Sequence, residues 1–515
     1  MDRISDLPNA LICHILSFLP IKEAVSTSVL AKRWKPLFLD QPNLVFDDSI
    51  YFNPPTSYKE KLTNARSFMR FVDGVLASQG NAPLNKFKLV GNFVVDELWV
   101  LEWIPNLLKR GVSDIHLNIS SFWADSDRSK FDPLPPEMFV NKTLVSLTII
   151  FEGGVNINVE GDVSLPKLKI LHLNYFKTTT STFNKILSGC HVLEELALTN
   201  LMWDGALEVE PCLVTVSIPT LERLTFVRYG KYDDANKGVP LSFDNPNVVY
   251  MEYDDTIADT YQQMSFGSLV EAKLGLRPTP DQLNYEGYDD YEINLLLNEM
   301  SSVTNFLNGV GNVKILHVNV NMLWVLGSCR DTIPVFNNLI HLTIATYRGI
   351  IWKALPALLK SCPNLVTLAF ESLKLFPLCF RDYITYTQID VWMCLCKFYV
   401  SNWRVVVRPC LSSSPVKVIE IFNFGENLDD DDDIDDDGNG GLVHCLKEKI
   451  DHVKFFLHKM PNLEQVRLHF LFSNEEDVMM KVFKELQELP REVASPNCNI
   501  QVLSDNLSLS FNTSD

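Results

Sequence analysis

Four histidines stand at matching places in a repeated apolar pattern, which makes them the first candidates for chemistry in this sequence. His116, His172 and His317 lie between the second and third apolar positions of their copies, and His341 lies two residues earlier, with the same parity. Imidazole is a common metal ligand and general base. If the copies form stacked strands about 4.8 Å apart, only His317 and His341 become neighbours, and their offset makes them diagonal. A metal site needs a third ligand and supporting hydrogen bonds, so we interpret the four histidines as the polar lining of one sheet face.

Other patterns that would carry catalysis do not occur. Gly309-Val310-Gly311 lacks the third glycine of a dinucleotide loop, and the sequence contains neither a GK[ST] phosphate loop nor a GxSxG nucleophile elbow. The eleven cysteines include no CxxC pair, and Cys394 and Cys396 are too close together for a usual zinc knuckle. We therefore expect no catalytic residue, no metal ligands and no cofactor, and an enzyme is the weakest of the functions considered.

The composition is that of a large, folded, acidic protein. The chain has 515 residues, 46% of them apolar, which is enough for two or more structural units with a sizeable core. Its formal net charge of −19 argues against general binding to nucleic acid. No run reaches the ~18 uncharged apolar residues of a membrane span, and Asp2 and Asp6 do not suit the positive flank of a signal peptide. We expect an intracellular protein, in the nucleus, the cytoplasm or both, that binds no membrane.

From residue 84 onward the pattern L-x-x-L-x-L recurs and indicates how these positions are arranged. Between Leu144 and Leu269 successive copies begin 24, 25, 28, 27 and 21 residues apart, within the range of about 20 to 29 typical of leucine-rich repeats. Each copy should contribute one short strand, and stacked copies form a parallel sheet on the concave face of a solenoid with helices outside. Clear copies begin at Leu144, Leu168, Leu193, Leu221, Val248, Leu269, Val313, Leu339 and Leu365, and plausible copies begin at Leu84, Val112, Val416 and Leu463.

Two segments between copies have interpretable patterns. Cys190 and Cys362 each precede a copy, and like the other cysteines they are expected to be reduced and buried. The long gap between Leu269 and Val313 contains apolar residues at helical spacing over residues 291–309, which predicts a longer helix on the outer face.

The first 48 residues have a different character, with apolar residues at helical rather than strand spacing. Asp6 can cap a helix that has Pro8 near its first turn and stops at Pro20. A second helix follows from Ile21, and a third segment carries Trp34 beside a basic edge. A domain this small buries about 60% or less of its unfolded surface, so an exposed apolar face here is best explained as a docking surface. The alternative is a helical cap that packs these positions against the rest of the chain.

These N-terminal residues resemble the F-box, on the strength of Leu7-Pro8, Ile15-Leu16, Leu19, Val25, Leu30 and Lys32-Arg33-Trp34. One departure is Pro36, which should end or kink the third helical segment just after Trp34. The resemblance implies that the segment docks on a Skp-type adaptor of a cullin ubiquitin ligase. The adaptor-binding residues would be Leu7, Pro8, Ile15, Leu16, Leu19, Val25, Leu30 and Trp34.

The repeats and the last third resemble plant F-box proteins with leucine-rich repeats and an FBD domain. Pro409-Cys410-Leu411, the stretch PVKVIEIFNF, a helix around Phe455 and Phe456, and MPNLEQVRLHF stand in that family's order. The expected α/β architecture is an F-box at 1–48, a linker at 49–82, a leucine-rich-repeat solenoid at 83–373, an irregular segment at 374–408 and an FBD-like unit at 409–515. Within the last unit, residues 429–441 are an acidic insertion, which we expect to stay mobile, with calcium binding as a minor alternative.

The resemblance implies that the chain is the substrate-recognition subunit of an SCF-type (Skp-cullin-F-box) ubiquitin ligase and does not itself catalyse a reaction. The alternatives are a protein-interaction scaffold without ligase recruitment and a small-molecule sensor. The target protein cannot be named, because a repeat fold does not specify its ligand. Residues between the apolar positions of the later copies should form the target-binding surface: Ile315, His317, Asn319, His341, Thr343, Thr367 and Glu371.

Overall fold

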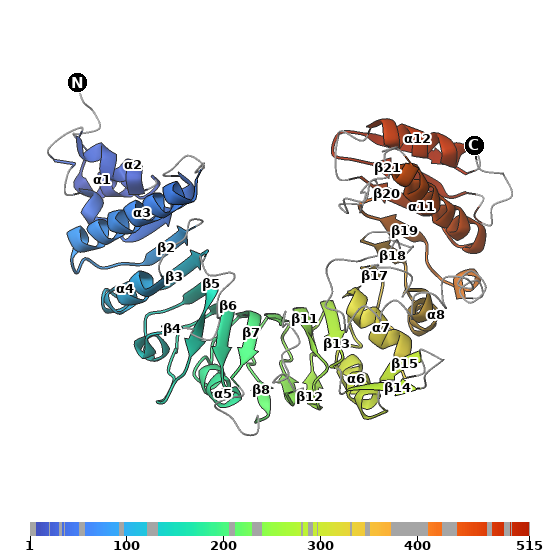
Figure 1. Ribbon diagram of the computed structural model, residues 1–515, viewed down its shortest axis with the longest axis horizontal. Coiled ribbons are helices and arrows are strands. Elements are labelled where there is room, and N and C mark those ends of the chain that lie inside the picture. The colour runs from blue at the N-terminus through green and yellow to red at the C-terminus, as the bar shows by residue number, and fades with distance from the viewer. Residues whose placement is uncertain are drawn as a thin grey trace. The chain divides into compact units, whose positions relative to one another are not determined.

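The computed structural model divides into two compact units, unit 1 (residues 1–248) and unit 2 (residues 249–515). It describes residues 7–19, 21–29, 33–34, 37–50, 57–91, 97–120, 132–204, 212–228, 239–279, 282–286, 292–295, 297–329, 332–345, 351–371, 410–424, 440–470, 476–488, 495 and 497–513. Figure 1 shows strands side by side in each unit, with helices along one side of them.

The predicted repeat is confirmed copy by copy. Each of the nine clear and four plausible copies begins two residues before the first residue of a strand, from Leu84 before Lys86 to Leu463 before Gln465. The starting residues are all buried, and so are Cys190 and Cys362, whose thiol pKa values are raised by burial to about 12. Local apolar spacing therefore determines where each strand begins.

Unit 1 is built on a parallel sheet. Its strands follow the order β1, β2, β3, β5, β6, β7 and β9, with every neighbouring pair parallel. The short β4 pairs with β5, and β8 pairs with β10. The strands are β1 Asn43–Asp47, β2 Lys86–Gly91, β3 Asp114–Ile119, β4 Asp132–Pro133, β5 Ser146–Ile157, β6 Ile170–Thr178, β7 Glu195–Trp203, β8 Val214–Val216, β9 Arg223–Val227 and β10 Leu241–Asp244.

The helices of unit 1 include one that the sequence reasoning missed. Residues 49–82, expected to be a linker, contain the 22-residue helix α3, whose Ser57 side chain accepts a hydrogen bond from the Glu60 backbone N–H. One face of α3 is buried, including Phe68 and Val72, so the segment is part of the folded unit. The helices are α1 Asn9–Leu16, α2 Ile21–Ser26, α3 Tyr58–Gln79, α4 Glu97–Lys109 and α5 Thr180–Ser188, and the 3-10 segments are η1 Thr27–Val29, η2 Leu37–Asp40, η3 Asp48–Ile50 and η4 Pro136–Val140.

Unit 2 continues the same design. Its sheet runs β11, β13, β16, β17, β18, β19, β20 and β21, all parallel, and β22 closes it as an antiparallel partner of β21. The strands are β11 Tyr250–Thr256, β12 Tyr261–Ser265, β13 Glu271–Arg277, β14 Leu283–Glu286, β15 Glu292–Leu295, β16 Ile315–Val318, β17 His341–Ile344, β18 Thr367–Phe370, β19 Val418–Ile421, β20 Gln465–His469, β21 Asn499–Leu503 and β22 Ser508–Asn512.

The helices of unit 2 correct one prediction and leave others open. The helix expected over residues 291–309 begins only at Leu297, because residues 292–295 form β15, which pairs with β14 in an antiparallel hairpin. The irregular segment 374–408 lies outside the described residues, as do residues 429–439 of the acidic insertion, whereas Gly440 and Gly441 begin α11. The resemblance of the C-terminal part to an FBD domain remains a prediction. The helices are α6 Leu297–Gly309, α7 Val320–Ser328, α8 Ile351–Ser361, α11 Gly440–Lys459 and α12 Glu476–Gln487.

Among the described residues, no helix has both the length and the apolar character needed to cross a membrane.

Candidate partner-binding surfaces

The N-terminal helices form a small core of their own. Leu16 is fully buried and Trp34 is 6% exposed, and both pack with Ile12, Ala24 and Leu37. Leu7 and Leu19 are partly buried against the same cluster. We expected Leu16 and Trp34 to lie on an open face without an internal partner, and this expectation is corrected because both lie inside the helical segment.

A second set of apolar side chains points outward from the same segment. Leu11 is 50% exposed, Ile15 43%, Phe18 75% and Val29 84%. Leu11, Ile15 and Phe18 are spaced by four and then three residues, so they share one face at the end of α1. Of these four, only Ile15 was among the predicted adaptor-binding residues. The spacing of three and four was visible in the sequence, but it could not show which of the two apolar faces packs inward.

The remaining predicted adaptor-binding residues have mixed positions. Pro8 is exposed and precedes α1 as its N-cap residue, and Val25 is half-buried on α2. Leu30 lies outside the described residues. Arg33 holds the third segment to the start of α1, because its guanidinium donates hydrogen bonds to the Asn9 side-chain oxygen at 2.7 Å and to the Leu7 carbonyl at 2.7 Å.

The second candidate surface is the open face of unit 2, defined here as the strand side chains that alternate with the buried ones. The structure brings the predicted pair together: the rings of His317 and His341 lie 6.4 Å apart, centroid to centroid. Ile315 stands between Glu271 and His341 in register on the three neighbouring strands, and Thr367 follows His341 on β18. Ile315, His317, His341 and Thr367 are all partly exposed, as a shared surface requires.

The centre of this face is less accessible than predicted. Thr343 pairs in register with Ala369, and the two residues are only 5% and 0% exposed. The Thr343 hydroxyl lies 3.1 Å from Nε2 of His341, so the histidine ring satisfies it. Thr343 is therefore a buried position between more exposed side chains and not an open contact residue, which corrects its predicted role. Glu371 follows β18 and is exposed.

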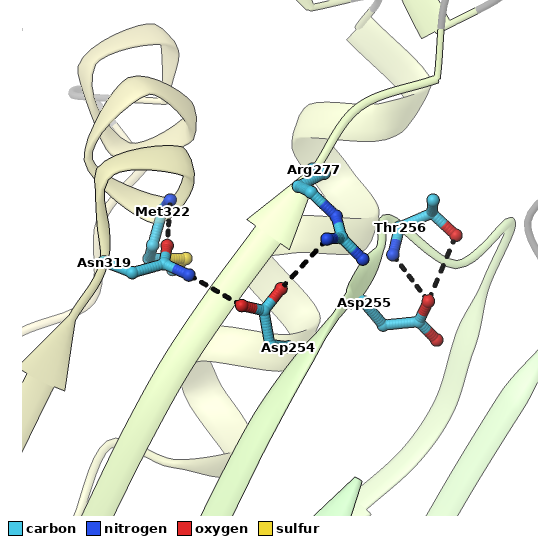
Figure 2. Close-up of polar contacts among 6 residues, drawn as sticks. All are labelled: Asp254, Asp255, Thr256, Arg277, Asn319 and Met322. Atoms are coloured by element: carbon cyan, nitrogen blue, oxygen red, sulfur yellow. Dashed lines mark hydrogen bonds and ion pairs between the residues drawn. The ribbon is translucent and has the colours of Figure 1, made fainter. Parts of the chain in front are cut away.

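Asn319 differs most from its predicted role, because it holds the fold together. Its side-chain oxygen accepts from the Met322 backbone N–H at 2.9 Å and so caps α7, while its Nδ2 donates to Oδ2 of Asp254 at 2.8 Å (Figure 2). Asn319 directly follows β16, and its hydrogen bond to Asp254 on β11 passes over Gly275 on β13, the strand between them. A Cβ on Gly275 would lie 2.3 Å from the Asn319 nitrogen and 2.5 Å from the Asp254 carboxyl carbon. Glycine is needed there because the two side chains occupy its space.

Burial determines the electrostatics of the open face. Burial raises the pKa of Asp254, and the Arg277 guanidinium, whose Nη1 lies 3.8 Å from Oδ1, acts against this rise; Figure 2 shows this pair. The pKa values of His317 and His341 are lowered, chiefly by burial. Glu271, whose carboxylate lies 3.5 Å from Nε2 of His317, works in the opposite direction. The two imidazoles therefore favour the neutral form, which suits hydrogen bonding more than charge pairing.

The other half of the open face carries a charge pair. On the neighbouring strands β19 and β20, Glu420 faces Arg467 in register, and the Arg467 guanidinium donates to the Glu420 carboxylate. A second nitrogen of Arg467 donates to the Gln465 side chain at 2.8 Å. Fixed polar groups of this kind give direction to a protein contact without a large apolar area.

The two remaining histidines lie on the corresponding face of unit 1. His116 and His172 are half-buried, and Thr148 lies between them in register. Nε2 of His172 is 2.9 Å from the Glu195 carboxylate. All four histidines thus occupy strand positions that alternate with buried residues, as their common parity predicted.

Comparison with known proteins gives matches over the whole chain. Residues 4–46 match the F-box domain, and residues 100–230 match a family described as FBD-associated F-box protein At5g56370, LRR repeats. An Arabidopsis thaliana protein whose name describes an F-box/LRR-repeat protein, At5g41840, is 52% identical and covers 99% of this chain and 96% of its own length. A second such protein, At4g00320, is 50% identical with coverage of 99% and 97%. A third, whose name adds FBD, At3g59240, is 41% identical with coverage of 98% and 90%. The chain therefore belongs to the plant F-box/LRR-repeat protein family.

Proposed function

We propose that this chain is the substrate-recognition subunit of an SCF-type ubiquitin ligase, in which the F-box binds a Skp-type adaptor and the repeats bind a target. The observation that carries the proposal is the exposed apolar face that Leu11, Ile15 and Phe18 form at the end of α1, with a fourth exposed apolar side chain, Val29, in the same F-box segment. Soluble proteins seldom expose several large apolar side chains side by side unless a partner covers them. The matched F-box domain supports a Skp-type adaptor as that partner.

The proposed adaptor surface is therefore revised from the one expected from sequence. Leu11, Phe18 and Val29 join Ile15 as direct contacts, whereas Leu16 and Trp34 support the face from within. A central aromatic or aliphatic anchor typically contributes about 2 kcal/mol or more to a protein interface. Phe18, 75% exposed and 4.9 Å from the His14 ring, is the candidate for that anchor.

For the target, we propose the open face of unit 2. Three observations support it. The rings of His317 and His341 lie close together, the small residues Thr343 and Ala369 beside them are buried, and Glu420 on β19 pairs with Arg467 on β20. Such a face offers hydrogen bonds around a shallow centre that a polypeptide segment can approach. Binding there would hold a target lysine near the conjugating enzyme and replace a bimolecular encounter with a local one.

Two variants with substitutions on different surfaces test the proposal. Ile15→Asp should abolish adaptor capture, and His317→Glu with His341→Glu and Thr367→Glu should leave adaptor capture intact. Both variants should stabilise the same set of cellular proteins, measured by quantitative proteomics against cells with the wild-type chain. Adaptor capture without any stabilised protein in the triple variant would move the target site elsewhere. Undiminished adaptor capture by Ile15→Asp would favour a scaffold or sensor that does not recruit a ligase.

A further inference from the structure

The F-box runs into the repeat sheet without a linker. Only Gln41 and Pro42 separate η2 from β1, and β1 is the parallel neighbour of β2. The Pro42 carbonyl accepts hydrogen bonds from the backbone N–H groups of Asn85 at 2.7 Å and Lys86 at 3.1 Å. Helix α3 contacts η2, and α2 contacts β1. The exit from the F-box is thus part of the first repeat.

A buried polar network spans this junction. Nε of Arg110 donates to the Ala82 carbonyl at 2.7 Å, and one of its terminal nitrogens donates to Oε1 of Gln79 at 2.5 Å. Nε2 of Gln79 in turn donates to the main-chain carbonyl of Gln41 at 3.2 Å. The network joins the end of α4, the end of α3 and Gln41, which lies between η2 and β1 in the last part of the F-box.

Stability alone does not explain this buried polar network, because burying its polar groups costs free energy. Arg110 is only 6% exposed, and burial lowers its pKa, yet no carboxylate pairs with it in the part of the chain that the structure describes. Among the described residues, neither its Nη1 nor the Nε2 of the 2% exposed Gln41 has a hydrogen-bond partner, although both nitrogens are buried. Apolar side chains would fill such a site at lower cost, so the polar groups call for another explanation. A guanidinium has donors fixed in a rigid fork, and two of them here hold two segments in one geometry.

We propose that Arg110 is a positioning residue which, through Gln79 and the Gln41 main chain, fixes the orientation of the F-box relative to the repeat sheet of unit 1. This inference rests on the proposed function, because a fixed orientation of the F-box sets the direction in which a bound adaptor lies from the repeat sheet of unit 1. The F-box and the first repeats then behave as one rigid body in a ligase, and no hinge separates them.

A distance measurement in the full chain tests the proposal without adaptor or target. Spin labels on bio-orthogonal amino acids replace Ser26 on α2 and Ser188 at the end of α5, which are both exposed and both in unit 1. Double electron–electron resonance should give a single narrow distance maximum for the wild-type chain. Arg110→Met, which keeps the length but removes the donors, should replace it by a broad or divided distribution. Arg110→Lys should also broaden it, because lysine keeps the charge but not the fork.

The matched control removes a hydrogen bond between the same two helices away from the F-box. Asp73 accepts from the indole N–H of Trp103 at 3.2 Å, so Asp73→Ala loosens α3 from α4 but leaves Gln41 untouched and should keep the narrow maximum. A folded Arg110→Met chain with the wild-type distribution would overturn the proposal. If Arg110→Met does not fold, Gln79→Met breaks the middle of the network, and the same two outcomes decide.

A parallel adaptor pull-down separates this inference from the proposed function. Arg110→Met leaves Leu11, Ile15 and Phe18 unchanged, so adaptor capture should match that of the wild-type chain. A wild-type chain that captures no adaptor would refute the ligase role, while the distance distributions would still decide whether Arg110 orients the F-box.

Discussion

The F-box and the repeat sheets use their outward side chains in opposite ways. On the F-box, Leu11, Ile15, Phe18 and Val29 present uncompensated apolar surface within 19 residues of sequence. On the open face of unit 2, polar groups satisfy one another, as in the Asn319–Asp254 bond and the Arg467–Glu420 pair. Apolar area supplies affinity for one partner of fixed shape, whereas polar groups select among partners by direction. The difference suits the two proposed partners, a Skp-type adaptor for the F-box and a particular target for the repeats.

The largest expected effect on stability comes from placing a charge on the buried face of α1 instead of its exposed face. Leu16→Asp places a carboxylate in the F-box core, whereas Ile15→Asp, one residue earlier, points it into water. We expect Leu16→Asp to cost on the order of 4 kcal/mol, enough to unfold the F-box locally, and Ile15→Asp to change stability little. Hydrogen exchange of the N-terminal amides measures this difference. Equal protection in the two variants would contradict the assignment of inner and outer faces.

A smaller effect on stability is expected from a substitution on the open face of unit 2. Gly275→Ala adds a Cβ in the space of the Asn319 and Asp254 side chains, and we expect it to cost about 1 to 3 kcal/mol in urea denaturation. Gly74→Ala is the control, because a Cβ there has no atom within 4 Å and the residue lies on the exposed side of α3. The control should gain about 0.5 to 1 kcal/mol, since alanine suits a helix better. Equal effects of the two substitutions would show that the bond over Gly275 contributes nothing.

The histidines of the open face should make stability depend on pH. Burial lowers the folded-state pKa of His317 and His341 below the unfolded value of about 6.5, so the unfolded chain binds protons first as the pH falls. Their contribution is complete above about pH 6.5 and is lost as the pH falls through the folded-state pKa. Glu271, Lys273 and Glu420 modulate these values without reversing the direction of the shifts.

The measurement is the midpoint of urea unfolding at pH 7.5 and 5.5 for the wild-type chain and a His317→Gln, His341→Gln variant. The variant should lose less stability between the two pH values. His116 and His469, whose pKa values are also lowered by burial, should keep part of the dependence in both chains. A variant with an unchanged difference would mean that the two imidazoles do not titrate differently on folding.

The smallest effect concerns the acidic run. Deletion of residues 429–439 should leave the melting temperature unchanged, because eight closely spaced aspartates repel one another and cannot enter a core. The deletion stops before Gly440, where α11 begins. Millimolar calcium should not raise the melting temperature of the wild-type chain, since the run lacks the alternating ligands and the turn of a calcium loop. A melting temperature lowered by several degrees would show that the run supports the fold.

The repeat strands could be predicted from sequence because their determinant is local. A buried residue two positions before each strand and apolar alternation within it recur in every copy, so thirteen strands could be placed in advance. Strands without that pattern, such as β1 and β21, were missed, because the residue two positions before each of them is polar, Gln41 and Asn497. Helix α3 was missed although its buried residues, such as Ala65, Phe68, Val72 and Val75, recur every three or four positions after a Ser57 cap.

The candidate surfaces were predicted less well than the strands. Both faces of α1 carry apolar residues, and only the packing of Trp34 and Leu37 shows that Leu16 is internal and Ile15 external. Asn319 has the parity of a contact residue, but it lies one position beyond β16 and caps α7. Periodicity identifies the side of a strand on which a residue lies. Whether that residue is free for binding depends on which other side chains and helix ends it can contact.

The central proposal is that the exposed F-box face binds the adaptor. The most direct test is a calorimetric titration of a purified Skp-type adaptor into the full chain and into Phe18→Asp. We predict a one-to-one complex with the wild-type chain and an affinity at least about thirtyfold weaker for Phe18→Asp, from the loss of about 2 kcal/mol or more at an interface anchor. The thermal melt of Phe18→Asp should match that of the wild-type chain. Equal affinity for the two chains would contradict the claim.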